Sequence, residues 1–251
     1  MKRTRTALAA TALALLSVTA LSGCGDSGSG SSASDSSDAS NGSADKAKGA
    51  SEKPADPTAE LNRAALAKSD AKGFTVKKPD AEYAFATSQG QVKVDKAVCA
   101  PIAYATNQLP LGPPKADLVR LATGAKGPGD YTYITLAAYS NGEAKTTLAG
   151  LSKAIRSCGA GLTAKADGNT GSYSSVTPEP AATPSGADES VAFRVTTKHE
   201  GVTHTMRAQA ARHGDILAVY YAVDGMAFTQ ARPGNAKIGK AVVDAQSAKL
   251  R

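Results

Sequence analysis

The chain has 251 residues, of which 41% are hydrophobic, so it is long enough for an extended leader and one domain of ordinary size. Its 29 Lys and Arg residues against 22 Asp and Glu residues give a net charge of +7. The basic residues are scattered and do not alternate with aromatic residues, which argues against nucleic-acid binding.

Residues 1–23 have the composition of an export signal. Three basic residues in the first five positions precede an apolar run over residues 7–21. That run is shorter than the roughly 20 residues that span a bilayer, and a basic start followed by a short apolar stretch is typical of a secretory signal peptide. The sequence therefore predicts a protein that is exported.

The signal ends at Leu21-Ser22-Gly23-Cys24, which resembles the lipobox of bacterial lipoproteins. In that family the cysteine thiol receives a diacylglycerol, the signal is cleaved before the cysteine, and the new amine can take a further acyl chain such as palmitate. The resemblance implies that Cys24 anchors the protein to the outer face of the plasma membrane. The alternative is an ordinary cleaved signal with a chance cysteine.

Residues 24–57 are predicted to be the lipidated cysteine followed by a disordered tether. Ser, Gly, Ala and Asp predominate there, and such a segment buries too little apolar surface to offset the entropy of ordering. Residues 58–251 are predicted to form a single extracytoplasmic domain. Its basic excess would attract anionic wall polymers or lipid head groups weakly, or would simply be a solvated surface.

The first half of this domain predicts short elements. An amphipathic helix begins at Leu61 and stops near Gly73. Short strands are predicted at residues 74–78, 82–87 and 116–123, a short alternating run at Val92 and Val94, and a helical turn from Ala100. The clearest strand begins at Asp130, and a helix follows it from residue 143 and stops at residues 159–161.

The second half predicts an antiparallel sheet. Residues 163–190 contain three prolines and are expected to be loop-rich, with one short strand at 173–176. Three strand patterns separated by turns follow between residues 190 and 223, which is typical of a meander, and a helix is expected over residues 234–250. Helices outside a run of paired strands indicate an α+β fold and not a parallel sheet.

Once Cys24 is assigned to lipidation, Cys99 and Cys158 remain as an even pair in an oxidising compartment. We expect them to form a disulfide. A metal pair or two free thiols are the alternatives, but the sequence has no CxxC spacing and no third sulfur ligand.

No catalytic motif is recognisable, so no catalytic residue, cofactor or metal is predicted. The GxSxG and GxxxxGK[ST] patterns are absent. His199, His204 and His213 fall at predicted turns, where exposed side chains are expected, with a structural zinc site as the minor alternative.

Tyrosines offer the only candidate ligand-binding face. Tyr131, Tyr133 and Tyr139 lie at alternate positions of the strand from Asp130, so they share one side of the sheet. Their rings could hold an apolar or sugar ligand while the hydroxyls stay hydrated. Ordinary packing under the helix that follows is the competing interpretation.

The order of elements resembles the extracytoplasmic sensor domains of actinobacterial receptor kinases of the PknH type and their free-standing lipoprotein relatives. The segments that carry the resemblance are LNRAALAKSDAKGFTV, VCAPIA, YITLAAYSNGEAKTTLAGLSKAIRSCGAGL and DILAVYYAV. The resemblance implies a non-catalytic domain that binds a ligand between sheet and helices. The expected ligand is a small molecule, a lipid or a cell-wall polymer; a protein-docking module and an envelope hydrolase are the alternatives.

Overall fold

The computed structural model describes residues 56–80, 84–125 and 129–251. The predicted signal, Cys24 and nearly all of the predicted tether lie outside the described residues, so their assignment stays a prediction. The following paragraphs concern the described ranges.

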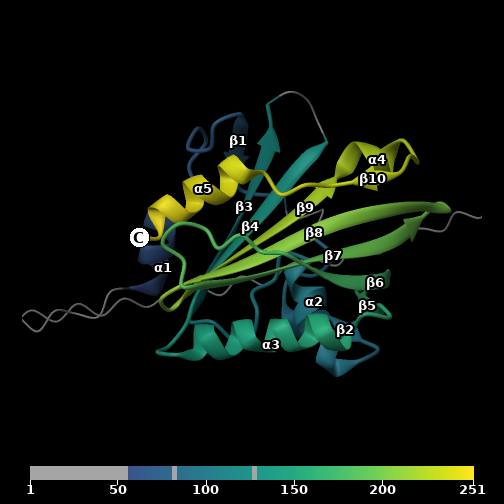
Figure 1. The fold of residues 1–251 in the computed structure, drawn as a ribbon, viewed down its shortest axis with the longest axis horizontal. Helices are drawn as coiled ribbons and strands as arrows, with labels where there is room; N and C mark the ends of the chain where they lie inside the picture. Colours follow the sequence, from purple (N-terminus) through teal and green to yellow (C-terminus); the bar gives the residue numbers. More distant parts are fainter. Residues whose placement is uncertain (1–55, 81–83, 126–128) are drawn as a thin grey trace, which may run out of the picture. The chain divides into compact units, whose positions relative to one another are not determined.

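Ten strands form one sheet, in the order β1-β3-β4-β9-β8-β7-β6-β5-β2, with every neighbouring pair antiparallel (Figure 1). The tenth strand, β10, lies off this path and pairs in parallel with the start of β8. The strands are β1 (Phe74–Lys77), β2 (Lys93–Val94), β3 (Ala116–Gly124), β4 (Asp130–Ala138), β5 (Leu162–Ala166), β6 (Asn169–Glu179), β7 (Glu189–His199), β8 (Val202–His213), β9 (Ile216–Asp224) and β10 (Gly234–Asn235). The predicted α+β class, with its C-terminal meander of β7, β8 and β9, is confirmed.

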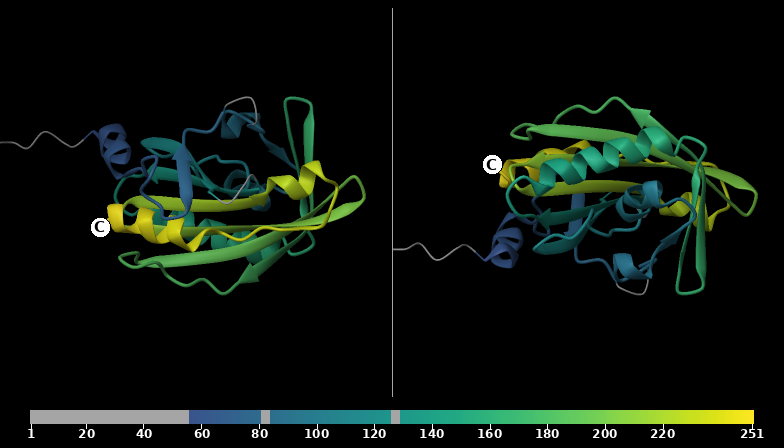
Figure 2. Two further views of the ribbon diagram at one scale, coloured as in Figure 1. Left: turned by 90° about the horizontal axis from the view of Figure 1, so that it is seen from above. Right: turned by 90° about the horizontal axis from the view of Figure 1, so that it is seen from below.

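Helices cover both faces of the sheet (Figures 1 and 2). The helix α3 packs on one face together with α2, and α1 and α5 lie on the other. The helical segments are α1 (Pro57–Ala64), α2 (Ala100–Ala105), α3 (Glu143–Ser157), α4 (Gly225–Thr229) and α5 (Lys240–Lys249), with 3-10 turns η2 (Gln89–Gln91) and η3 (Ala97–Cys99).

Alternation along β4 divides the core into two clusters. Ile134 and Leu136 pack with the helices α1 and α5, whereas Tyr133 and Ala137 pack on the α3 face. Successive side chains of a strand point to opposite faces, so one strand serves both clusters. The centre of the sheet is therefore hydrophobic on both faces, as expected for strands that are covered by helices on each side.

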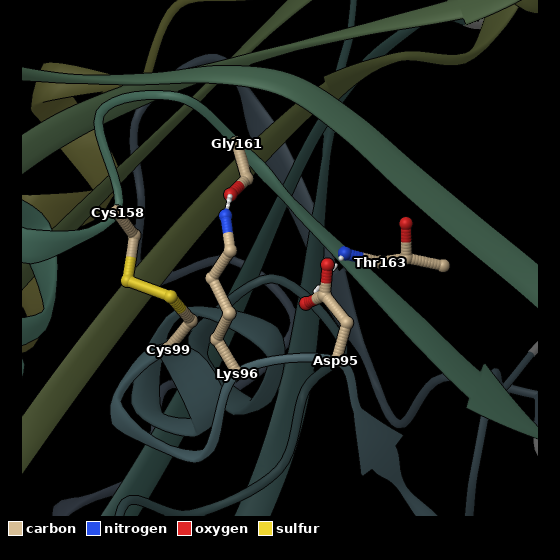
Figure 3. Close-up of a disulfide and its surroundings, with 6 residues drawn as sticks. All are labelled: Asp95, Lys96, Cys99, Cys158, Gly161 and Thr163. Atoms are coloured by element: carbon tan, nitrogen blue, oxygen red, sulfur yellow. Dashed lines mark hydrogen bonds between the residues drawn. A yellow bond between two sulfur atoms is a disulfide. The ribbon is translucent and has the colours of Figure 1, made fainter.

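A disulfide between Cys99 and Cys158 joins η3 to the end of α3, which confirms the predicted pairing (Figure 3). The two sulfur-bearing residues are 0% and 1% exposed. Close to the bridge, the Lys96 Nζ donates to the Gly161 carbonyl at 3.2 Å, and the Thr163 N–H donates to Asp95 Oδ1 at 3.1 Å (Figure 3). The disulfide is thus buried, and hydrogen bonds join the segments on either side of it.

The loop-rich prediction for residues 163–190 is wrong for most of the segment, because β5 and β6 form a hairpin there. Its two-residue turn is Asp167-Gly168, and both residues have positive φ angles, 46° and 80°. Asp-Gly is a strong signal for this kind of turn. Pro178 is tolerated within β6 because β5 pairs only with the first part of that strand, which leaves Pro178 with a strand neighbour on one side.

Three other boundaries differ from the predictions. The first helix ends at Ala64 and not near Gly73, because the Gln246 amide accepts from the Leu66 N–H and donates to the Ala64 carbonyl. Residues 84–87, part of the expected strand over 82–87, contain no strand. The last helix starts at Lys240, since residues 234–235 pair with β8 instead.

Candidate functional site

A pocket of about 860 Å³ lies beside the edge of the sheet at β3. Its walls come from residues within 78–80, 84–90, 107–114 and 117–120, together with Asn62. Residues of α1, of the stretch after β1, of the loop after α2 and of β3 therefore meet around one concave surface.

The pocket reaches an unpaired stretch of the sheet edge. The strand β1 pairs only with Leu121–Gly124, and Pro79 follows two residues after β1 ends. Proline has no N–H and cannot continue a strand ladder. Among the described residues, positions 116–120 of β3 consequently have β4 as their strand neighbour on one side and no strand on the other.

The loop over residues 107–114 forms a fixed wall of the pocket. The Gln89 Nε2 donates to the Pro110 carbonyl at 2.6 Å and to the Gly112 carbonyl at 2.7 Å. The Tyr139 hydroxyl donates to the carbonyl of Leu111 between them. Side chains from two different directions thus hold three consecutive carbonyls of this loop, which makes the wall preformed.

Asn107 connects the pocket to the buried core. Its Nδ2 donates to the Ala103 carbonyl at 2.7 Å and lies 3.5 Å from the Tyr173 hydroxyl, which is 2.9 Å from the Thr106 Oγ1. Burial raises the pKa of Tyr173, and the hydrogen bonds from Thr106 and Asn107 oppose that shift. The phenol is therefore neutral and acts as a structural hydrogen-bonding group.

Charged side chains around the pocket differ in how they are paired. Asp80 forms an ion pair with Lys77 at 2.9 Å. Asp117 and Lys78 form no hydrogen bond or ion pair with any described residue, and Arg120 donates only to the neighbouring Val119 carbonyl. Partial burial by the surrounding protein raises the pKa of Asp117, although the residue is exposed to solvent. These three charges are available to a ligand.

None of the three residues of the predicted tyrosine face is part of the pocket lining. Tyr139 is 5% exposed and supports the wall loop through its hydroxyl. Tyr133 is half-buried and its ring stacks on Tyr221, with centroids 6.2 Å apart. Tyr131 is half-buried against Gly225, where a Cβ atom would lie 2.2 Å from the Tyr131 Cε2. Their role in binding stays a prediction.

The expectation of exposed histidines is wrong for two of the three. His204 is 1% exposed and His213 is 6% exposed, while His199 is exposed. The β7–β8 turn is confined to residues 200–201, so His204 already lies in the strand ladder and points into the core. The sequence pattern could not reveal this, since α4 supplies the aromatic ring that covers His204.

His204 stacks on the Phe228 ring with centroids 3.9 Å apart, and the His199 ring is 6.3 Å away. Neither ring nitrogen of His204 has a hydrogen-bond partner among the described residues. Burial lowers the pKa of His204, so the ring is held neutral. Within the described part of the chain, no group of three or more His, Cys, Asp and Glu residues could hold a metal ion.

Sequence reasoning missed Asp117 and Arg120 because a charged residue in a short strand is usually read as solvated. The available signal was their position beside the proline-rich stretch at residues 110–114. The described part of the chain also contains no helix that is both long and apolar enough to cross a bilayer.

No protein-family model matches the sequence, and no curated protein is similar to it. Two solved structures are similar in outline. The extracellular domain of PknH from Mycobacterium tuberculosis has 13% identity and a TM-score of 0.44, over 71% of this chain and 83% of that chain. An uncharacterised protein from Mycobacterium smegmatis, an Rv0999 ortholog, has 14% identity and a TM-score of 0.33, over 76% of this chain and 92% of that chain.

Proposed function

We propose that this protein is a non-catalytic, sensor-like domain that binds a ligand outside the cell and is held to the membrane by lipid on Cys24. The observation that carries the proposal is the preformed pocket beside β3 with its uncommitted charges. Its volume of about 860 Å³ falls within the roughly 300–1,000 Å³ range of ligand pockets.

The lining of the pocket supports recognition of a ligand with both polar and apolar parts. Leu109, Pro110 and Pro113 contribute apolar surface. Asp117 offers a carboxylate, and Lys78 and Arg120 offer cations. Such a mixture fixes the orientation of a ligand, because few polar groups surrounded by apolar surface select one pose.

Native mass spectrometry of the protein purified from its own host tests the binding function. We expect a co-purifying mass that is retained in the native protein and lost in the double variant Asp117→Asn with Arg120→Gln. Asp244→Asn with Lys240→Gln is the matched control, because this exposed pair on α5 is remote in sequence and does not line the pocket. Equal retention in both double variants would contradict the assignment of the pocket.

The anchor rests on the lipobox-like sequence and needs its own test. Two acyl chains give stable membrane attachment where one does not. We expect Cys24→Ala to release the protein into the medium or to leave it unprocessed, as seen by membrane fractionation. Unchanged fractionation of this variant would exclude lipid anchoring through Cys24.

A further inference from the structure

The free edge of β3 carries backbone groups that point into the pocket. The Ala125 N–H donates to the Gly73 carbonyl at 2.9 Å, which extends the β1–β3 ladder by one residue pair. In an antiparallel ladder, alternate residues direct both their N–H and their C=O toward the same neighbour. Counting back by twos from Ala125, the groups that face the β1 side beyond its end belong to Val119 and Asp117.

Val119 gives independent support for this direction. Its carbonyl accepts a hydrogen bond from the Arg120 Nη1 at 3.0 Å, whereas a carbonyl turned toward β4 would be occupied by the ladder. The N–H of Val119 and both backbone groups of Asp117 have no partner strand within the described ranges. A strand edge of this kind is a template for adding another strand.

Charged side chains near the edge determine which side chains a segment paired with β3 would need. Asp117 and Val119 lie on the α3 face of the sheet, while Arg120 lies on the opposite face. Lys78 and Arg120 both line the large pocket and also a smaller one of about 370 Å³. A segment paired with β3 would thus meet a carboxylate on one face and two cations on the other.

From this geometry we propose that the pocket binds an extended peptide, which adds to the sheet antiparallel to β3 in continuation of β1. This proposal rests on the binding function assigned to the pocket. Residues directly opposite in a ladder share a face, so the peptide places a basic side chain opposite Asp117. Because Lys77 of β1 occupies the position opposite Leu121, an acidic residue just before the paired residues lies outside the ladder, beside Lys78 and Arg120. The acidic residue comes first in the peptide and the basic residue three positions later.

A capped peptide, acetyl-Thr-Glu-Thr-Val-Lys-Thr-amide, is the probe, and its binding to the full chain is measured by isothermal titration calorimetry. The third and fifth residues would pair with Val119 and Asp117. We expect N-methylation of these two residues to weaken binding by tenfold or more, and N-methylation of the second and fourth residues to change it less than threefold. Equal effects of the two methylated peptides would overturn strand addition.

Variants of Val119 test the same edge from the protein side. Val119→Pro removes an N–H that faces the pocket, and proline is tolerated on a free strand edge. We expect at least a tenfold loss of peptide affinity, while the matched Val119→Ala variant, which keeps the N–H, stays within threefold. If Val119→Pro unfolds the domain, the methylated peptides still decide the question.

The remaining outcomes separate the two proposals. A host ligand that is lost on changing Asp117 and Arg120, combined with no peptide binding, would refute strand addition and keep the binding pocket. If changing Asp117 and Arg120 causes no loss of a host ligand and no peptide binds, both the binding pocket and strand addition are refuted. Amide NMR signals of Asp117 and Val119 that shift on deleting residues 27–55 would show that the protein's own tether occupies the edge, and would overturn an external peptide.

Discussion

Two regions of the sheet contain polar groups that have no hydrogen-bond partner among the described residues, and they differ in access to solvent. At the β3 edge, the Asp117 carboxylate and the N–H of Val119 open into a pocket that reaches solvent. At the α4 corner, His204 is sealed beneath Phe228 with both ring nitrogens unpaired by described residues. Water or a ligand can satisfy the first set at little cost, whereas the second set destabilises the fold. Unpaired polar atoms thus indicate a binding site only where the surface is open.

The largest loss of stability should come from removing the disulfide that holds α2, the helix before the wall loop of the pocket. Replacing Cys99 and Cys158 together by Ser opens a loop with a sequence separation of 59 residues, and the loop-entropy model gives up to about 4 kcal/mol of lost stability. The wall loop follows α2 directly, so we also expect weaker ligand retention. Chemical denaturation measures the loss, and reduction of the unchanged protein under denaturing conditions is the control.

A smaller loss is expected at Tyr133, between the two regions. Tyr133→Ala should cost about 2 kcal/mol, which is less than the 3–5 kcal/mol of a fully buried aromatic residue because this ring is half-buried. Tyr133→Phe, which keeps the stacking on Tyr221, should be close to neutral. Ligand retention unaffected by either change would reject the tyrosine face as a binding surface.

Burial of His204 beneath α4 should make the stability of the domain depend on pH. Burial lowers the pKa of His204 in the folded state below the ordinary value near 6.5, so the unfolded chain takes up a proton first as the pH falls. The free energy of unfolding therefore keeps its full value above pH 6.5 and decreases as the pH falls below 6.5. Nearby Asp224 opposes this shift, and exposed His199 reinforces it.

His204→Phe should remove this penalty and raise stability by about 1 kcal/mol at neutral pH, since it also removes two unpaired nitrogens. Its advantage should grow between pH 6.5 and 5 in urea denaturation. Buried His213, whose pKa is also lowered, leaves a residual slope in the variant. His199→Phe is the matched control, and an identical pH profile for both variants would contradict burial of an unpaired neutral ring at position 204.

The smallest effect is expected from the tether. Deleting residues 27–55 should leave the thermal midpoint within about one degree, because a segment of this composition contributes little packing. A large drop measured by calorimetry would show that the tether packs on the domain. The β3 edge could then be covered by the chain itself, as His204 is covered by Phe228.

Local pattern was sufficient for the elements whose own side chains specify them. The alternation from Asp130 predicted β4, helical spacing through Leu148 and Leu151 predicted α3, and the meander followed from three strand patterns and their turns. The disulfide followed from the even pair of cysteines that remains once Cys24 is assigned to lipidation in a chain predicted to be exported. The Asp167-Gly168 hairpin was also present in the sequence as a turn signal, although the prolines after it concealed it.

Tertiary structure alone decided the features that depend on residues distant in sequence. Gln246 ends α1 from 182 positions away, and Phe228 turns an apparent surface histidine into a buried one. The pocket exists because β1 stops short of the full length of β3, while Gln89 and Tyr139 hold the loop opposite. Periodicity reports which face of an element is apolar, but it does not report where a neighbouring strand ends. That end point leaves the N–H of Val119 without a partner strand among the described residues.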